Sequence, residues 1–242
     1  MKLTVINSGS ASNGYVIHND NEAVVLECGC PLIACEKVLH FNVKKVSGVF
    51  VTHEHKDHAG FITDYSKYMP IYASEGTLKA CGCLGVLNCN SIPMLKTIHL
   101  GRFSVLAFPT EHDASQPCGF LIYHPEVGNI LFATDTYYVK YKFKQLSYIM
   151  LEANYDRKIL DHNVQQLVIP LSVRNRVLKS HMSIDTCIDT LRANDLSSVN
   201  GIVLIHLSGN NSNREDFVQR VRQETGKFCV AAERGLEIEL IK

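Results

Sequence analysis

The stretch VSGVFVTHEHKDH, residues 46–58, determines how the rest of the chain is interpreted. Its first seven residues are mainly apolar and β-branched and have the length of a buried strand. Where a strand passes into a loop, residues two apart can point to one side, so His53 and His55 can offer imidazoles to one metal ion. Asp57 and His58, on the turn beyond, can serve a second ion. A solvated polar turn is the alternative, but so dense a group of metal-binding side chains directly after a buried strand disfavours it.

The overall composition is that of a packed globular protein. Of the 242 residues, 46% are hydrophobic and 20% are charged, which favours one large domain or two small ones over a disordered chain. Lys+Arg and Asp+Glu both number 24, so the chain has no bulk positive field. Any contact with nucleic acid must therefore come from a local basic patch.

The chain contains no apolar run that approaches the roughly 18 residues of a membrane span. Polar residues from Asn7 onward interrupt the N-terminal segment too early for the apolar core of a signal peptide. We therefore expect a cytoplasmic protein that makes no membrane contact, with its nine cysteines acting mostly as small buried hydrophobes.

Strands precede helices in each half of the chain, about 1–100 and 101–242. Apolar alternation and turn residues predict the following strands: Leu3–Asn7, Tyr15–His18, Ala23–Glu27, Val46–Thr52, Ile71–Ala73, Thr97–Leu100, Phe103–Pro109, Gly119–His124, Asn129–Ala133, Ile149–Glu152, Gly201–Ile205 and Leu236–Ile241. Helical spacing and capping residues predict these helices: Pro31–Phe41, Ala59–Lys67, Glu75–Leu87, Ile184–Ala193 and Arg214–Glu224. We expect a single 1–242 domain of the α/β class, a four-layer αββα sandwich of two stacked mixed sheets with outer helices.

The HxHxDH pattern of residues 53–58 resembles the signature of the metallo-β-lactamase superfamily. The resemblance implies further metal ligands at strand ends downstream, and three candidates follow in order: His112, Asp135 in an Ala-Thr-Asp-Thr context, and His206. It implies one metal ion held by His53, His55 and His112, a second held by Asp57, His58 and His206, and Asp135 bridging both.

Two divalent ions of this kind suit hydrolysis. Imidazole and carboxylate favour Zn²⁺ or Mn²⁺, with Fe as a further possibility. Two closely spaced ions lower the pKa of a water between them and clamp the oxygens of the centre under attack.

Two loops narrow the resemblance to the YycJ/WalJ family of small bacterial nucleases. Residues 8–14, SGSASNG, resemble the family's SGSSGN loop, and residues 206–211, HLSGNN, resemble its HLSxxNN motif. Both are also ordinary turn sequences. The resemblance makes the following residues substrate-binding candidates: Ser10, Asn13, Ser208, Asn210 and Asn211.

A third motif, KSHMS at residues 179–183, resembles the family's GHLS motif and the GHST motif of RNase Z. There the histidine is not a ligand but assists at the scissile phosphate, which makes His181 a catalytic candidate together with Asp57. Ser180 replaces the usual glycine. Two buried-strand carboxylates, Glu27 and Glu152, are candidates for orienting the metal ligands or His181.

The segment Lys140–Lys144, KYKFK, alternates cations with aromatic residues. Its lysines could neutralise phosphates while Tyr141 or Phe143 stacks on a base, or it is an amphipathic strand with solvated lysines. Arg174, Arg176 and Lys179 add positive charge before the KSHMS motif.

The spacing between motifs excludes two relatives of this fold. The segments between Asp135 and His206 are too short for the inserted domain of β-CASP nucleases, and those between His112 and Asp135 are too short for the tRNA-gripping arm of bacterial RNase Z. The resemblance therefore implies a metal-dependent phosphodiester hydrolase, a 5′ to 3′ exonuclease acting on DNA. The alternatives are a small-molecule phosphodiesterase of the same fold and a catalytically silent metal-binding interaction module.

Overall fold

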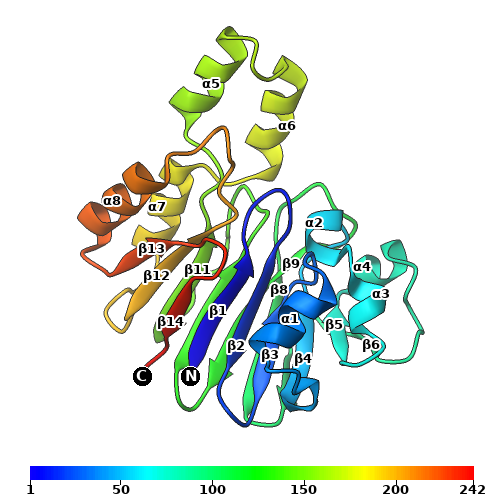
Figure 1. Ribbon diagram of the computed structural model, residues 1–242. Helices are drawn as coiled ribbons and strands as arrows, with labels where there is room; N and C mark the ends of the chain where they lie inside the picture. The colour runs from blue at the N-terminus through cyan, green and yellow to red at the C-terminus, as the bar shows by residue number, and fades with distance from the viewer.

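A computed structural model describes all residues, 1–242, as two stacked seven-stranded sheets with helices on the outer faces (Figure 1). The first sheet has the order β14 (Glu237–Glu239), β1 (Lys2–Asn7), β2 (Gly14–His18), β3 (Ala23–Leu26), β4 (Val46–Val51), β5 (Ile71–Ala73) and β6 (Cys89–Ser91). The second has the order β13 (Cys229–Ala231), β12 (Gly201–Ile205), β11 (Leu146–Glu152), β10 (Gly128–Ala133), β9 (Cys118–His124), β8 (Phe103–Pro109) and β7 (Thr97–Leu100).

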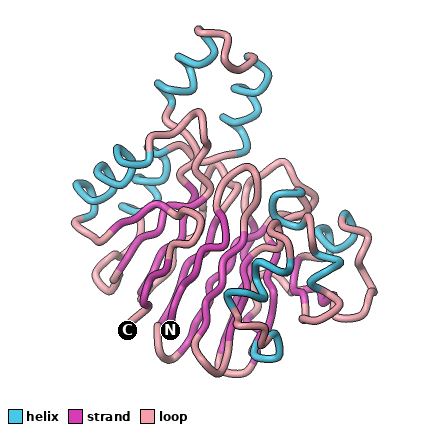
Figure 2. Tube along the Cα trace, in the orientation of Figure 1, coloured by secondary structure: helices cyan, strands magenta, loops and turns pink.

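The helices form the outer layers and one projection (Figure 2). Those beside the first sheet are α1 (Leu32–Val38), α2 (Lys56–Ala59), α3 (Ile62–Tyr65) and α4 (Glu75–Ala80), with the 3₁₀ turn η1 (Val43–Lys45). Those beside the second sheet are α7 (Ile184–Arg192) and α8 (Arg214–Thr225). The remaining pair, α5 (Arg157–Gln165) and α6 (Leu171–Ser180), projects from one end of the sandwich (Figure 1).

The central strands are buried on both faces, which explains their continuous apolar sequences. In β12, Val203 and Ile205 point into the core between the sheets, whereas Ile202 and Leu204 point into the core beneath α7 and α8. In the first sheet, Tyr15 of β2 faces the inter-sheet core, and its neighbour in sequence packs beneath α1. Three separate apolar cores therefore hold four layers together, as expected for the αββα sandwich.

The direction of the strands places the loops that matter for function. Strands β3 to β6 are mutually parallel in the first sheet, as are β10 to β13 in the second. Ligand sites of such sheets lie outside the carboxyl ends of the parallel strands. Glu27, His53, Asp135, Glu152 and His206 all follow or end these strands.

Several boundaries differ from the sequence-based expectations. The helix expected over Ala59–Lys67 is two short helices, α2 and α3, and β6, β13, α5 and α6 were not predicted. In α5 and α6 only Leu160 and Ser180 are buried, so no apolar stripe marks these helices in the sequence. The last strand, β14, returns to pair with β1 in the first sheet, so both chain ends lie side by side (Figure 1).

None of the helices is long and apolar enough to cross a membrane. All nine cysteines are free, and seven are buried.

Candidate metal centre and active site

Three side chains of the site start from strained backbone at strand ends. Glu27, Asp135 and His206 have φ values of 66°, 45° and 54°, in the left-handed region that residues other than glycine rarely adopt. Such conformations persist where the surrounding structure imposes them, and they cluster at functional sites. Here they turn each side chain inward across the ends of the two sheets.

The first ligand group consists of His53, His55, His112 and Asp135. His55 Nδ1 lies 3.1 Å from His53 Nε2 and 3.2 Å from His112 Nε2. Asp135 Oδ2 lies 3.5 Å from His112 Nε2 and 3.8 Å from His53 Nε2. Ligand atoms about 2.0–2.1 Å from a tetrahedral zinc ion lie about 3.3–3.4 Å apart, so these spacings fit one ion.

Hydrogen bonds on the far side of two rings fix which nitrogens face the centre. Thr52 Oγ1 donates to Glu27 Oε1 at 2.7 Å, so it accepts from His53 Nδ1–H at 2.9 Å. His112 Nδ1–H donates to the carbonyl of Ser180 at 2.7 Å. Burial lowers the pKa of both His53 and His112, which keeps the rings neutral. Their Nε2 lone pairs therefore converge on one point, an arrangement that a cation stabilises.

The second ligand group consists of Asp57, His58, Asp135 and His206. His58 Nε2 lies 3.2 Å from Asp57 Oδ2 and 3.3 Å from Asp135 Oδ1. His206 Nε2 lies 3.4 Å from Asp57 Oδ2, and His206 Nδ1 lies 2.9 Å from Asp135 Oδ1. The two carboxylate oxygens of Asp135 thus face different groups, as a bridging ligand requires.

The charges of the site call for cations. Four carboxylates there have only histidines as ion-pair partners, and no Lys or Arg pairs with them; they are Glu27, Asp57, Asp135 and Glu152. A fifth, Asp113, lies 3.3 Å from His112 Nε2 and pairs with Arg176 at the rim of the site. Burial disfavours charge on His58, but Asp135 and Glu27 outweigh it and raise its pKa well above the usual value. The same balance lowers the pKa of Asp135 well below its usual value, through His206 and His58.

Two buried nitrogens have no hydrogen-bond partner. His58 Nδ1 faces Glu27 at 3.4 Å, whereas His206 Nε2 faces Asp57 in the second ligand group. Converging lone pairs, carboxylates without a cation and the unpartnered nitrogen of His206 together fit divalent metal ions. The residues of the first and second ligand groups are those that would hold them.

Glu27 supports the ligands from the first sheet, as expected for an orienting carboxylate. It is fully buried, accepts from the backbone and side chain of Thr52, and lies 3.4 Å from His58 Nδ1. It therefore acts on His53 through Thr52 and on His58 directly. The sequence analysis did not identify Thr52.

Glu152 plays a similar part at the end of β11. Its Oε1 lies 2.7 Å from His181 Nδ1 and 3.0 Å from His206 Nδ1, while its Oε2 accepts from the backbone N–H groups of Thr136 and Met182. Burial disfavours charge on His181, but Glu152 outweighs it and raises the pKa of the imidazole. Because Nδ1 is bound to Glu152, Nε2 is the ring nitrogen of His181 that remains free.

A glycine that the sequence analysis did not identify allows the close packing of residues 52–58, the loop that carries the first ligands and that we call the metal loop. A Cβ on Gly29 would lie 1.7 Å from the carbonyl oxygen of Asp57, so only glycine allows this approach. The same carbonyl accepts from the backbone N–H of Asn13 at 2.7 Å. The only feature of the sequence that could have indicated this role is the glycine of the Cys-Gly-Cys segment that follows β3.

A cavity of about 350 Å³ opens onto the two ligand groups. It is lined by metal-ligand candidates, by His181, and by residues of three loops and one helix: Ser10, Asn154, Val173, Arg176, Val177, Ser208 and Asn211. Three of the five substrate-binding candidates thus line it.

The other two substrate-binding candidates do not line this cavity. Asn13 is fully buried behind the metal loop, where its side chain bonds Gly9 and approaches Asp57 and His58. The backbone carbonyl of Asn210 accepts from Asn163 of α5. The structure therefore corrects the assignment of Asn13, whose side chain is buried away from the cavity. Asn210 is exposed and does not line the cavity, so its role stays a prediction.

The segment Lys140–Lys144 is amphipathic with exposed lysines, as the second expectation has it, but it is not a strand. It has no regular secondary structure, and its aromatic rings pack on Phe108, with centroid distances of 5.6 Å for Tyr141 and 4.9 Å for Phe143. These rings contribute to the core beneath the second sheet and are not free to stack on a base.

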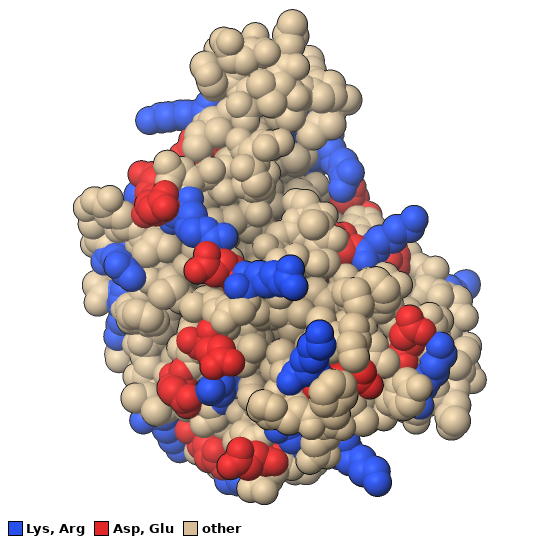
Figure 3. All heavy atoms as spheres, viewed as in Figure 1, with Lys and Arg blue, Asp and Glu red and all other residues tan.

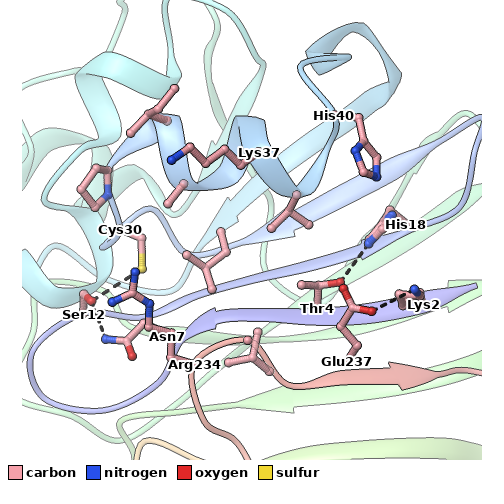
Figure 4. Close-up of a pocket in the computed structure, with 17 residues that line it drawn as sticks. Lys2, Thr4, Asn7, Ser12, His18, Cys30, Lys37, His40, Arg234 and Glu237 are labelled. Carbon is pink, nitrogen blue, oxygen red and sulfur yellow. Dashed lines mark hydrogen bonds and ion pairs between the residues drawn. The ribbon is translucent and has the colours of Figure 1, made fainter.

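A larger cavity lies elsewhere. A groove of about 760 Å³ runs between α1 and the strands β1 and β14 (Figure 4). Its only carboxylate, Glu237, is paired with Lys2. The groove contains none of the metal-ligand candidates, so the smaller cavity is the candidate active site.

Comparison with known proteins agrees with this geometry. The sequence profile of the beta-lactamase superfamily domain matches residues 35–207. Exodeoxyribonuclease YycJ from Bacillus anthracis is 28% identical, over 93% of this chain and 90% of that protein.

Solved structures show the same fold. The metallo-β-lactamase fold protein YhfI from Bacillus subtilis superimposes with a TM-score of 0.73 at 15% identity, covering 98% of each chain. The short form of human tRNase Z superimposes with a TM-score of 0.65 at 17% identity, covering 100% of each chain. The chain belongs to the beta-lactamase superfamily and is a hydrolase with the metallo-β-lactamase fold.

Proposed function

We propose that this chain is a two-metal nuclease that hydrolyses phosphodiester bonds of DNA, as a 5′ to 3′ exonuclease. The observation that carries the proposal is the position of His181. It lines the cavity beside both ligand groups, yet it lies outside them and is held by Glu152. Such a residue suits a reaction whose leaving oxygen needs a proton.

The relative named exodeoxyribonuclease supports the choice of DNA as the substrate. Its similarity extends over 93% of this chain, which includes the residues of both ligand groups and the KSHMS motif. The relative's name supports exonuclease activity, and the sequence resemblance implies the 5′ to 3′ polarity.

When bound, two divalent ions would activate a water and stabilise the charge that develops on the phosphate. The residues that would hold them are His53, His55 and His112 on one side, and Asp57, His58 and His206 on the other, with Asp135 between. Manganese or zinc suits this mixture of imidazole and carboxylate donors.

The chain's own side chains supply the rest of the chemistry. Glu152 Oε1 accepts from His181 Nδ1–H, which turns His181 Nε2 toward the cavity as the proton donor to the leaving 3′-oxygen. Asp57, exposed to the cavity, accepts a hydrogen bond from the attacking water and orients it. Ser208 and Asn211 offer hydrogen bonds to phosphate oxygens.

The test is hydrolysis by purified protein supplied with Mn²⁺ or Zn²⁺. The substrates are single- and double-stranded DNA labelled at either end, matched RNA, and bis(4-nitrophenyl) phosphate. We expect mononucleotides or short oligonucleotides released progressively from the 5′ end of DNA. Hydrolysis of the small ester alone would favour a small-molecule phosphodiesterase, and no hydrolysis of any substrate would favour a silent metal-binding module.

A further inference from the structure

The projecting helical pair is strongly basic, although the chain as a whole has no net charge. We call residues 157–180, which comprise α5, α6 and their connection, the arm. The arm contains one acidic residue, Asp161, and five basic residues: Arg157, Lys158, Arg174, Arg176 and Lys179. Lys and Arg side chains emerge on both flanks of the arm, below an uncharged tip (Figure 3).

The arm is anchored to the loop that carries His206. Asn163 of α5 donates to the carbonyl of Asn210 at 2.8 Å and to Asn211 Oδ1 at 2.9 Å. At its other end, the carbonyl of Ser180 accepts from His112 at 2.7 Å. The arm therefore has a defined position over the metal ligands.

One face of α6 forms a wall of the active-site cavity. Val173, Arg176 and Val177 line the cavity, and their spacing of three and four residues places them on one side of the helix. This wall suits a nucleic-acid strand, because the strand alternates sugars and bases, which apolar side chains can contact, with phosphates, which a guanidinium can bind.

Two cations of α6 are available to a ligand, Arg176 on the cavity wall and Lys179 beyond it. The side chain of Arg176 is 63% exposed and has one ion-pair partner, Asp113 Oδ2 at 3.3 Å. Lys179 lies one turn further along α6, is exposed, and has no ion-pair partner. By contrast, Arg174 and Arg157 both bind Asp161 within the arm.

We propose that the arm is a backbone clamp for a nucleic-acid strand. Arg176 and Lys179 bind the phosphates next to the scissile one, while Val173 and Val177 contact the sugar or base between them. An arginine fork binds phosphate in a bidentate manner, and each neutralised phosphate adds affinity that falls with salt. This inference rests on the proposed function and deepens it, because such a clamp selects polymers over small phosphodiesters.

The test measures binding separately from cleavage. Metal-loaded protein is titrated against a fluorescent single-stranded phosphorothioate oligonucleotide, which resists hydrolysis, at several KCl concentrations. For Arg176→Gln and for Lys179→Gln we expect the slope of log affinity against log salt to fall by about 0.7, and for the double variant by about 1.4. We expect the double variant to bind roughly tenfold more weakly or worse at about 0.1 M salt.

The matched control is Lys37→Gln. Lys37 is an exposed cation without an ion-pair partner, but it lines the groove of Figure 4 instead of the active-site cavity. We expect it to leave the salt slope at the wild-type value. Unchanged slopes in both arm variants, or an equal loss in Lys37→Gln, would overturn the clamp.

A further variant separates phosphate binding from a purely structural role of Arg176. Asp113→Asn breaks the same ion pair but removes a negative charge and leaves the arginine. Because Asp113 Oδ1 also lies 3.3 Å from His112 Nε2, metal content is measured with binding and compared with wild type. We expect it to bind the oligonucleotide as tightly as wild type or more tightly. Weakening equal to that of Arg176→Gln would show that Arg176 only braces the loop, and would refute the clamp.

The same protein distinguishes this inference from the proposed function. If wild type degrades DNA but its binding does not depend on the arm, the clamp fails and the nuclease assignment stands. If binding depends on the arm but no polynucleotide is hydrolysed, the nuclease assignment fails and the clamp stands.

Discussion

Histidines and carboxylates gather at both ends of the sandwich, but only at one end do the carboxylates among the histidines lack a Lys or Arg partner. At the end opposite the active-site cavity, buried His124 lies 3.0 Å from Glu22, and Arg102 binds both Glu22 at 3.1 Å and Glu126 at 2.8 Å. At the carboxyl ends of the parallel strands, the carboxylates of the two ligand groups, with Glu27 and Glu152, pair only with histidines. The first cluster is neutralised by the chain itself, whereas the second needs ions from solution.

This difference teaches how to read such clusters. Glu22, His124 and Glu126 lie close enough to hold an ion, but Arg102 already neutralises both carboxylates. The cluster links the β2–β3 turn, which carries Glu22, the β7–β8 turn, which carries Arg102, and the β9–β10 turn, which carries Glu126, and this suits a structural role. Whether such a cluster binds a metal ion therefore depends less on the number of potential ligands than on the presence of a neutralising Lys or Arg side chain.

Removal of metal should have the largest effect on the active-site end and almost none on the fold. Chelation should abolish all hydrolysis while far-UV circular dichroism stays nearly unchanged, because three apolar cores support the sandwich without the site. Global unfolding on chelation would mean that the ions hold the two sheets together.

Asp135→Ala should remove at least one metal ion and nearly all turnover, since both ligand groups share this carboxylate. Elemental analysis and hydrolysis of labelled DNA provide the measurement. Full metal content in the variant would contradict a bridging position. Asp135→Asn tests the same carboxylate with a side chain of nearly equal volume.

His181→Ala should leave metal content intact and lower turnover on DNA by about 10²–10⁴-fold, the usual contribution of a general acid. An activated ester such as bis(4-nitrophenyl) phosphate needs little help in departure and should suffer much less. Metal analysis accompanies the kinetics, because Asp135, Glu152, His181 and His206 also lie close enough to hold an ion. Loss of metal would make His181 a ligand, and equal small losses on both substrates would make it structural.

Gly29→Ala should destabilise the protein by about 3 kcal/mol, because the new Cβ overlaps the backbone of the metal loop. Chemical denaturation gives the free energy of unfolding. Gly209→Ala is the control: nothing lies within 4 Å of its Cβ position, and we expect a change within about 0.5 kcal/mol. Similar stabilities for the two variants would show that the loop moves aside freely.

Arg102→Gln should have the smallest effect. It removes the internal cation of the opposite end, so we expect a slightly lower unfolding midpoint with metal content and turnover unchanged. A loss of either quantity would show that the two ends are coupled and would break the comparison between them.

The sequence predicted the site best where ligands follow strands. His53 to His58 could be recognised from local spacing, whereas Asp135 and His206, each after a buried strand, were implied by the resemblance to the metallo-β-lactamase superfamily. It predicted worst where a role depends on contacts from elsewhere. Asn13 lies in a loop that suggested phosphate binding, but the approach of the metal loop turns it into a buried brace.

The sequence by itself determined most strands of both sheets, because alternating burial is a local property, and the motif of residues 53–58 with its family resemblance gave the order of the ligand candidates. Only the tertiary structure decided which ring nitrogens face the centre, since the carbonyl of Ser180 orients His112 across 68 positions. It also decided that α6 walls the cavity and that Glu152 joins His181 to His206. These contacts form between segments whose own sequences carry no sign of one another, so packing of the whole chain has to bring them together.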